Sequence, residues 1–154
     1  MTERTELANI MLEKAGWFPG RKVDLEQIRE AFSKSGMRLY DEVQNFLEEF
    51  DGICLYDEEL SGVGSESVIS IKSSDGVGFW NSEIAEINRI NRHFGVNLTR
   101  IGEFGYSSQI LISENGLIWF NHYQLSLEHG MEIGIDRNLA FNKIAENWRP
   151  DGNI

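Results

Sequence analysis

The stretch from Gln109 to Asn121, Q-I-L-I-S-E-N-G-L-I-W-F-N, constrains the fold of this chain more than any other. Two runs of aliphatic and aromatic residues flank Asn115-Gly116, the pair that most readily adopts the positive φ angles of a type I′ turn. The pattern therefore predicts a β-hairpin with a two-residue loop. Such a pair of strands is not stable alone in water, so the rest of the chain must supply its cover.

The two-residue loop also predicts the register of the hairpin. Four pairs should face each other: Glu114 and Leu117, Ser113 and Ile118, Ile112 and Trp119, and Leu111 and Phe120. One face would then carry Ile110, Ile112, Leu117 and Trp119, and the other Leu111, Ile118 and Phe120. Both faces are mainly apolar, which predicts that helices or further strands cover at least one of them.

The remaining periodicities predict an α+β fold in which helices flank a central, mostly antiparallel sheet. Helical spacing and capping residues mark five segments: Thr5–Ala15, Asp24–Gly36, Asp41–Phe50, Ser82–Gly95 and a final helix that starts at Asp136. Besides the hairpin, four short stretches favour strands: Ile53–Tyr56, Ser67–Lys72, Leu98–Ile101 and Tyr123–Leu127.

Length and composition indicate one globular domain that spans residues 1–154, with 41% hydrophobic residues and 2 prolines. The first residues lack the apolar run of a signal peptide, and no stretch is apolar enough to span a bilayer. We therefore expect a cytoplasmic protein without a membrane partner. Cys54 is the one cysteine, which excludes an intrachain disulfide and a CxxC site, and we expect it to be a small buried residue.

Charge is the strongest polar signal in the chain, which carries a formal net charge of -11. No lysine or arginine lies between Arg38 and Lys72, where nine acids fall: Asp41, Glu42, Glu48, Glu49, Asp51, Asp57, Glu58, Glu59 and Glu66. Such a patch repels nucleic acid and anionic membranes and attracts basic partners. It is equally well explained as a solvated face that aids solubility.

The motifs of catalysis and cofactor binding are absent from the sequence. No dinucleotide or P-loop glycine pattern and no GxSxG elbow occurs, and the three histidines form neither an HxxxH nor an HExxH pair. Three adjacent acids, Asp57, Glu58 and Glu59, raise the possibility of glycoside hydrolysis, but that reaction needs two acids held apart across a cleft. We expect no catalytic residue, cofactor or metal. Trp80, at a loop-to-helix junction, is either a plug over the core or an exposed interface anchor.

Two blocks of the sequence resemble the SUKH superfamily, in particular its third branch. The first is Ala15-Gly16-Trp17 followed by Pro19-Gly20-Arg21 and Val23-Asp24, and then a helix that ends F-L-E-E-F before Gly52. The second is Ile101-Gly102 ahead of the hairpin. The resemblance runs from about Leu7 to Ala145, and Asp51 departs from it where a small residue is expected. We interpret Trp17 as a core residue and Arg21 as the partner of a carboxylate or a loop carbonyl.

The resemblance implies a SUKH-like α+β domain and a role as a bacterial immunity protein that binds and neutralises a cognate toxin. Many such toxins are nucleases, whose phosphate-binding surfaces are basic, and an acidic surface could occupy one. Two alternatives are a regulatory or scaffolding module and, less favoured by the residues, a small carbohydrate-active enzyme. The expected partner-binding residues are Asp57, Glu58, Glu59, Glu66, Asp75 and Trp80.

Overall fold

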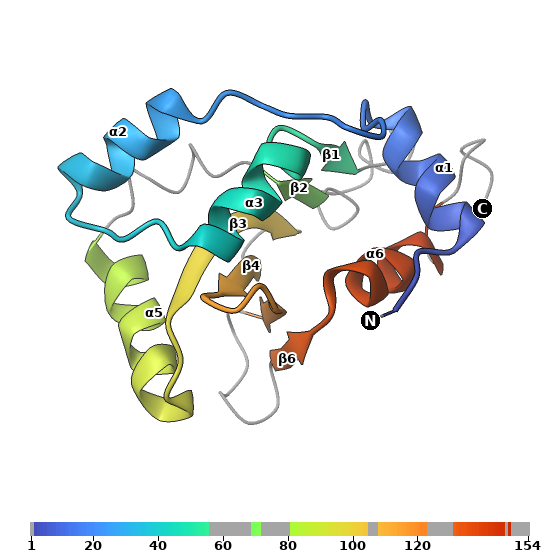
Figure 1. Cartoon of the computed structure of the whole chain (residues 1–154). Helices are drawn as coiled ribbons and strands as arrows, with labels where there is room; N and C mark the ends of the chain where they lie inside the picture. The colour runs from blue at the N-terminus through green and yellow to red at the C-terminus, as the bar shows by residue number, and fades with distance from the viewer. Residues whose placement is uncertain are drawn as a thin grey trace.

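A computed structural model describes residues 2–55, 69–71, 81–104, 108–122, 131–146 and 148 (Figure 1). These residues form a six-stranded sheet whose strands lie in chain order, each antiparallel to its neighbours. The strands are β1 (Cys54–Leu55), β2 (Ile69–Ile71), β3 (Leu98–Phe104), β4 (Ser108–Ser113), β5 (Ile118–His122) and β6 (Met131–Ile135). The predicted α+β class with an antiparallel sheet is confirmed.

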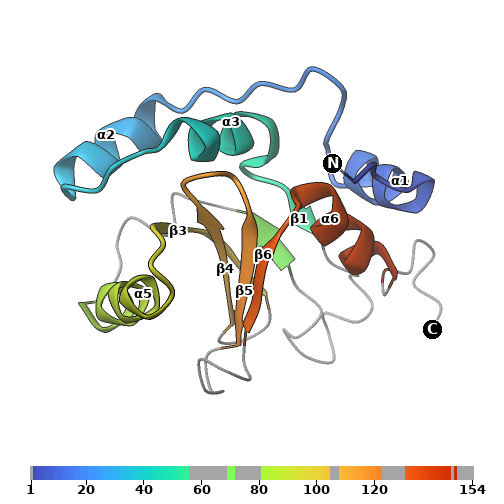
Figure 2. The ribbon, with the colours of Figure 1, turned by 60° about the horizontal axis from the view of Figure 1, so that its bottom comes forward.

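The described helices are α1 (Glu6–Lys14), α2 (Glu26–Lys34), α3 (Asp41–Phe50), α5 (Asn81–Phe94) and α6 (Arg137–Glu146). Figure 2 shows the sheet edge-on, with α5 beside one face, α6 on the opposite side, and α2 and α3 across one end. The N-terminal segment reaches α6, since Asn142 accepts a 2.8 Å hydrogen bond from the backbone N–H of Thr5. Elements from both ends of the chain therefore cover the same side of the sheet.

The hairpin forms where the sequence predicts it, but the predicted register is wrong by one residue. Ser113 N–H donates to the Leu117 carbonyl at 2.9 Å, so the loop holds residues 114–116, and Ile112 faces Ile118. Gly116 has φ +87°, whereas no non-glycine residue among those described has a positive φ. The loop is thus a turn closed by one left-handed glycine, which spares Asn115 the strain that a type I′ turn would impose.

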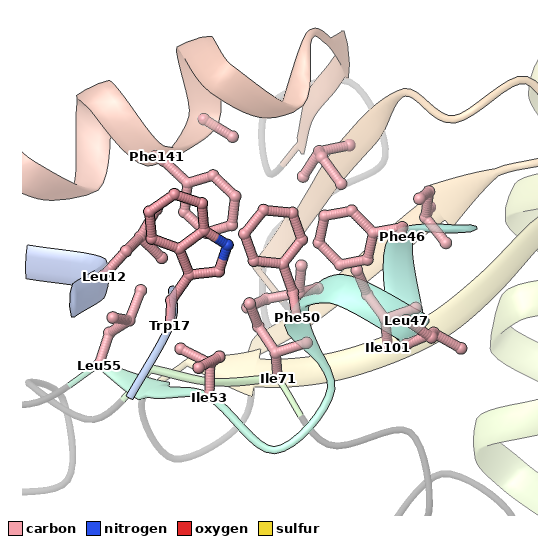
Figure 3. Packing of buried hydrophobic residues seen from close by; sticks show 14 of the residues in the cluster. Leu12, Trp17, Phe46, Leu47, Phe50, Ile53, Leu55, Ile71, Ile101 and Phe141 are labelled. Carbon is pink, nitrogen blue, oxygen red and sulfur yellow. The ribbon is translucent and has the colours of Figure 1, made fainter. Parts of the chain in front are cut away.

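This register changes which side chains share a face. Ile110, Ile112, Ile118 and Phe120 lie in the larger core, whereas Leu111 and Trp119 lie in a second cluster on the opposite face. The α3 stripe Val43, Phe46, Leu47 and Phe50 is buried in the larger core as predicted, where the Phe50 ring lies 4.7 Å from that of Phe141 (Figure 3). Helix α5 covers the second cluster with Ile87 and Ile90. Both faces of the hairpin are therefore covered.

Several predicted boundaries differ from the structure. The N-cap of α2 is Leu25, one residue later than the predicted Asp24. The Asp24 carboxylate still accepts a 3.0 Å hydrogen bond from Glu26 N–H. Ser82 lies inside α5 and is not its N-cap. Strand β3 continues to Phe104, three residues beyond the predicted end at Ile101. A bulge between Arg100 and Gly102 interrupts the alternation of its side chains, so the sequence pattern did not show this part of the strand.

Strand β6 was not predicted from the sequence. Gly134, with φ +62°, lies where the register against β5 shifts between Ile118 and Phe120, so the alternation of side chains is broken. The predicted strand Tyr123–Leu127 lies outside the described residues. Helix α6 starts as predicted, since the Asp136 carboxylate accepts from the N–H groups of Asn138 and Leu139.

Candidate partner-binding surface

The six predicted partner-binding residues lie outside the described part of the chain: Asp57, Glu58, Glu59, Glu66, Asp75 and Trp80. The described part of the acidic stretch belongs to α3 and its C-cap, and its carboxylates are Asp41, Glu42, Glu48, Glu49 and Asp51. Their surroundings divide them into acids that hold the fold together and acids that face outward.

Glu49 is a half-buried carboxylate with basic and aromatic neighbours. Its carboxylate accepts a 3.1 Å hydrogen bond from Trp17 Nε1 and lies 4.0 Å from the Arg137 guanidinium. The Arg4 guanidinium lies 4.5 Å above the Trp17 ring. Burial lowers the pKa of Arg4, and the nearby Glu49 carboxylate opposes that shift. Glu49 therefore links α3 to Trp17 and to α6.

The Trp17 and Arg21 segment is structural, as the sequence predicts. Trp17 is buried among Leu12, Phe50 and other core residues (Figure 3). The Arg21 guanidinium donates to the main-chain carbonyls of Glu49 at 2.6 Å and Asp51 at 2.7 Å. These carbonyls lie at the C-terminus of α3, where helical partners are missing. The most recognisable motif of the sequence thus anchors α3.

Glu48 also has internal partners. Its carboxylate lies 3.6 Å from the Arg29 guanidinium of α2 and accepts a 3.3 Å hydrogen bond from the Gln44 amide. Its side chain is 21% exposed, so water screens the ion pair only in part. Glu48 and Glu49, two of the nine acids of the acidic stretch, are therefore half-buried and link α3 to neighbouring segments.

Three carboxylates do face solvent together, and we call them the acidic tip: Asp41, Glu42 and Glu114. Asp41 and Glu42 occupy the first turn of α3, where the helix dipole favours negative charge. The Glu42 side chain lies against the hairpin loop, with Oε2 3.4 Å from the position of a Cβ built on Gly116. None of the three takes part in an ion pair with another described residue.

The sequence did not predict the acidic tip. Asp41 and Glu42 belong to the acidic stretch that it singled out, but Glu114 follows 48 positions after Glu66 and joins them only through the fold. The available signal was the hairpin itself, because its loop must lie at one end of the sheet and carries Glu114 there.

A groove of about 190 Å³ borders the acidic tip. Its described lining comes from three parts of the chain, the α2–α3 connection, α5 and the start of β3: Phe32, Met37, Arg38, Tyr40, Ile87, Asn88, Asn91, Asn97, Leu98, Thr99 and Arg100. Asn97 joins groove and tip, because its side-chain amide donates to the Glu114 carboxylate at 3.2 Å. Tyr40 immediately precedes Asp41.

The surroundings of Cys54 differ from the expectation of a buried side chain. Ile53 and Leu55 are buried, but the alternation of the strand turns Cys54 to the other face, where it is half-buried. Burial raises the pKa of its thiol, which lowers the fraction of reactive thiolate.

Within the described ranges, no group of three histidine, cysteine or acidic side chains could hold a metal ion. No helix found there combines the length and apolar character needed to cross a membrane. What the described residues do show is an acidic tip that adjoins a groove through the Asn97–Glu114 hydrogen bond.

Comparison with known families decides what kind of protein carries this surface. A family model described as SUKH-3 immunity protein matches residues 4–145. The chain belongs to the SUKH-3 immunity protein family. The predicted resemblance to the third branch of the SUKH superfamily is thereby confirmed, and membership supports a role in immunity to a toxin. No curated protein and no solved structure matches this SUKH-3 chain.

Proposed function

We propose that this SUKH-3 protein neutralises a cognate toxin by binding it stoichiometrically, in the cytoplasm and without catalysis. Family membership supports the immunity role, and the acidic tip is the observation that carries the mode of binding. Three solvent-facing carboxylates without an ion pair to a described residue are ready to pair with a basic surface. In an acidic chain of net charge -11, they favour a basic partner.

The proposed partner is a basic toxin domain, in particular a nuclease. A nuclease presents lysine and arginine side chains to grip phosphate, and carboxylates placed on those side chains compete with the nucleic acid. The acidic stretch from Asp57 to Glu66 extends this proposal to residues beyond the described ones. Association with a basic partner should be fast and should weaken as salt rises.

The alternative proposal is a SUKH-like regulatory or scaffolding module whose partner is an ordinary cellular protein. The reading frame next to the gene distinguishes the two, because an immunity protein is made beside its toxin. Co-expression with the protein encoded by that frame gives a direct test. Growth that the frame abolishes and this chain restores supports neutralisation, whereas growth that is unaffected by the frame favours the regulatory module.

Charge reversal tests the acidic surface separately from the immunity role. We expect Glu58→Lys combined with Glu59→Lys, and the tip variant Asp41→Lys, Glu42→Lys, Glu114→Lys, each to weaken protection. Protection that is complete in both variants would place the toxin on another surface of the same protein.

A further inference from the structure

The groove beside the acidic tip has an apolar floor of limited size. Phe32, Ile87 and Leu98 are buried residues that reach its lining from α2, α5 and β3. Pockets for drug-sized ligands measure roughly 300–1,000 Å³. At about 190 Å³ the groove suits a single large side chain better than a small-molecule cofactor.

The charged residues of the described lining are both positive, although the chain as a whole is acidic. Arg38 is exposed, and its guanidinium lies 4.7 Å from the centre of the Tyr40 ring. No ion pair among the described residues involves Arg38. Arg100 has a side chain that is 9% exposed and lies 3.2 Å from the Glu103 carboxylate. Stacking holds the Arg38 guanidinium at the rim, where its donors match a carboxylate.

Asparagine amides supply the remaining polar groups of the groove. Asn91 accepts a 3.0 Å hydrogen bond from Leu98 N–H, which fixes the start of β3 against α5. Asn97 donates to Glu114. The exposed Asn88 amide has no described partner and can pair with the main chain of a bound segment. The groove therefore combines an apolar floor with donors at its rim.

We propose that this groove receives a partner-protein segment in which an apolar side chain is accompanied by a carboxylate. The apolar side chain would lie on Phe32, Ile87 and Leu98, and the carboxylate would meet Arg38. The proposal deepens the proposed function, because the Asn97–Glu114 hydrogen bond makes groove and acidic tip one continuous surface. A toxin that contacts the tip would place such a segment over the groove and fix its orientation.

The test uses the full chain, labelled with ¹⁵N, and two probes that differ only in charge: N-acetylphenylalaninate and N-acetylphenylalaninamide. We expect saturable shifts of the backbone amide signals of Asn88, Leu98 and Thr99, with the carboxylate probe at least about threefold tighter than the amide probe. Arg38→Gln should abolish that preference. Arg92→Gln, which removes a cation of α5 outside the groove, should leave it unchanged.

A second variant tests whether the probes bind in the groove itself. Asn88→Trp should fill the groove without removing a charge, and we expect it to abolish binding of both probes. Equal affinity for the two probes, no saturable shift at these signals, or a preference that survives Arg38→Gln would overturn the proposal. The assay contains no toxin, so its failure leaves neutralisation standing, and failed neutralisation leaves the groove assay unaffected.

Discussion

The Arg21 guanidinium donates a 2.6 Å hydrogen bond to the main-chain carbonyl of Glu49, in the last turn of α3. A second bond of 2.7 Å reaches the carbonyl of Asp51. No lysine or arginine stands in the last turn of α3 itself, so its carbonyls depend on a cation from elsewhere in the chain. Arg21 thereby couples the segment after α1 to the helix whose first turn carries Asp41 and Glu42 of the acidic tip.

Replacing Arg21 should destabilise the fold through this cap. We expect Arg21→Ala to lower the free energy of unfolding by about 2–4 kcal/mol, because two charge-assisted hydrogen bonds are lost. Arg21→Lys should lie between the alanine variant and the native protein, since an ammonium lacks the planar fork. Urea denaturation measures all three. The exposed neighbour Lys22 provides the control, and Lys22→Ala should change stability by less than about 0.5 kcal/mol. Equal losses for Arg21→Ala and Lys22→Ala would contradict the capping role.

The hairpin loop predicts unequal costs at two adjacent residues. Gly116→Ala should cost about 1–2 kcal/mol, because alanine must adopt φ +87°. Asn115→Ala should cost less, since Asn115 has no positive φ and loses only its hydrogen bond with the Ser113 hydroxyl. Thermal or urea unfolding measures both values.

Gly95→Ala is the matched control for the hairpin, with φ +67° and open space around the added Cβ. It should cost about as much as Gly116→Ala, because a Cβ at Gly116 makes only ordinary contact with Glu42, at 3.4 Å or more. An Asn115→Ala cost equal to that of Gly116→Ala would instead favour a two-residue loop with two left-handed positions.

This loop shows how far the sequence determines the fold. Asn115-Gly116 located the hairpin, but the same pair serves a two-residue or a three-residue loop, and each loop gives a different register. The contacts that decide between them are those of the Ser113 hydroxyl and the two packed faces, which become visible only in three dimensions. Gly134 concealed β6 in a similar way, since its bulge breaks the alternation on which strand prediction rests.

Regular helices were predicted more accurately. The bounds of α3, Asp41–Phe50, agree with the prediction because four apolar residues follow one helical stripe and Gly52 adopts φ +86° just beyond. The proposed binding surface was harder to predict, because its residues converge from α3, β3, α5 and the hairpin loop. Sequence proximity placed Glu48 and Glu49 in one stretch with the outward-facing acids, although these two half-buried carboxylates have partners in Arg29 and Trp17.

The thiol of Cys54 should react slowly in the folded protein. Because burial raises its pKa, folded Cys54 keeps its proton at pH values where an unfolded cysteine begins to lose it. The rate of reaction with a disulfide reagent should therefore rise at higher pH for the native chain than for the chain in urea, measured between about pH 7 and pH 10. Because Cys54 is the one cysteine of the chain, the measured thiol reaction comes from this residue alone.

The same pKa shift fixes the sign of its effect on stability. The favourable contribution of protonated Cys54 is present below the pKa of the unfolded thiol and is lost as the pH rises through the folded value. Identical pH profiles for native and unfolded chain would contradict the raised pKa.

The measurement that tests the central claim most directly is a titration of the purified toxin domain with three forms of this protein, at low and at high salt. The native protein is compared with the tip variant, Asp41→Lys, Glu42→Lys, Glu114→Lys. A control of equal net charge reverses three exposed acids of α1 and α2, Glu6→Lys, Glu13→Lys and Glu26→Lys.

We predict a one-to-one complex that weakens as salt rises, and a Kd that the tip variant raises by about tenfold or more while the control changes it far less. The salt dependence should also be smaller for the tip variant, because fewer charged pairs remain in its complex. A Kd that both variants change equally, or that neither variant nor salt changes, would contradict toxin binding through the acidic tip.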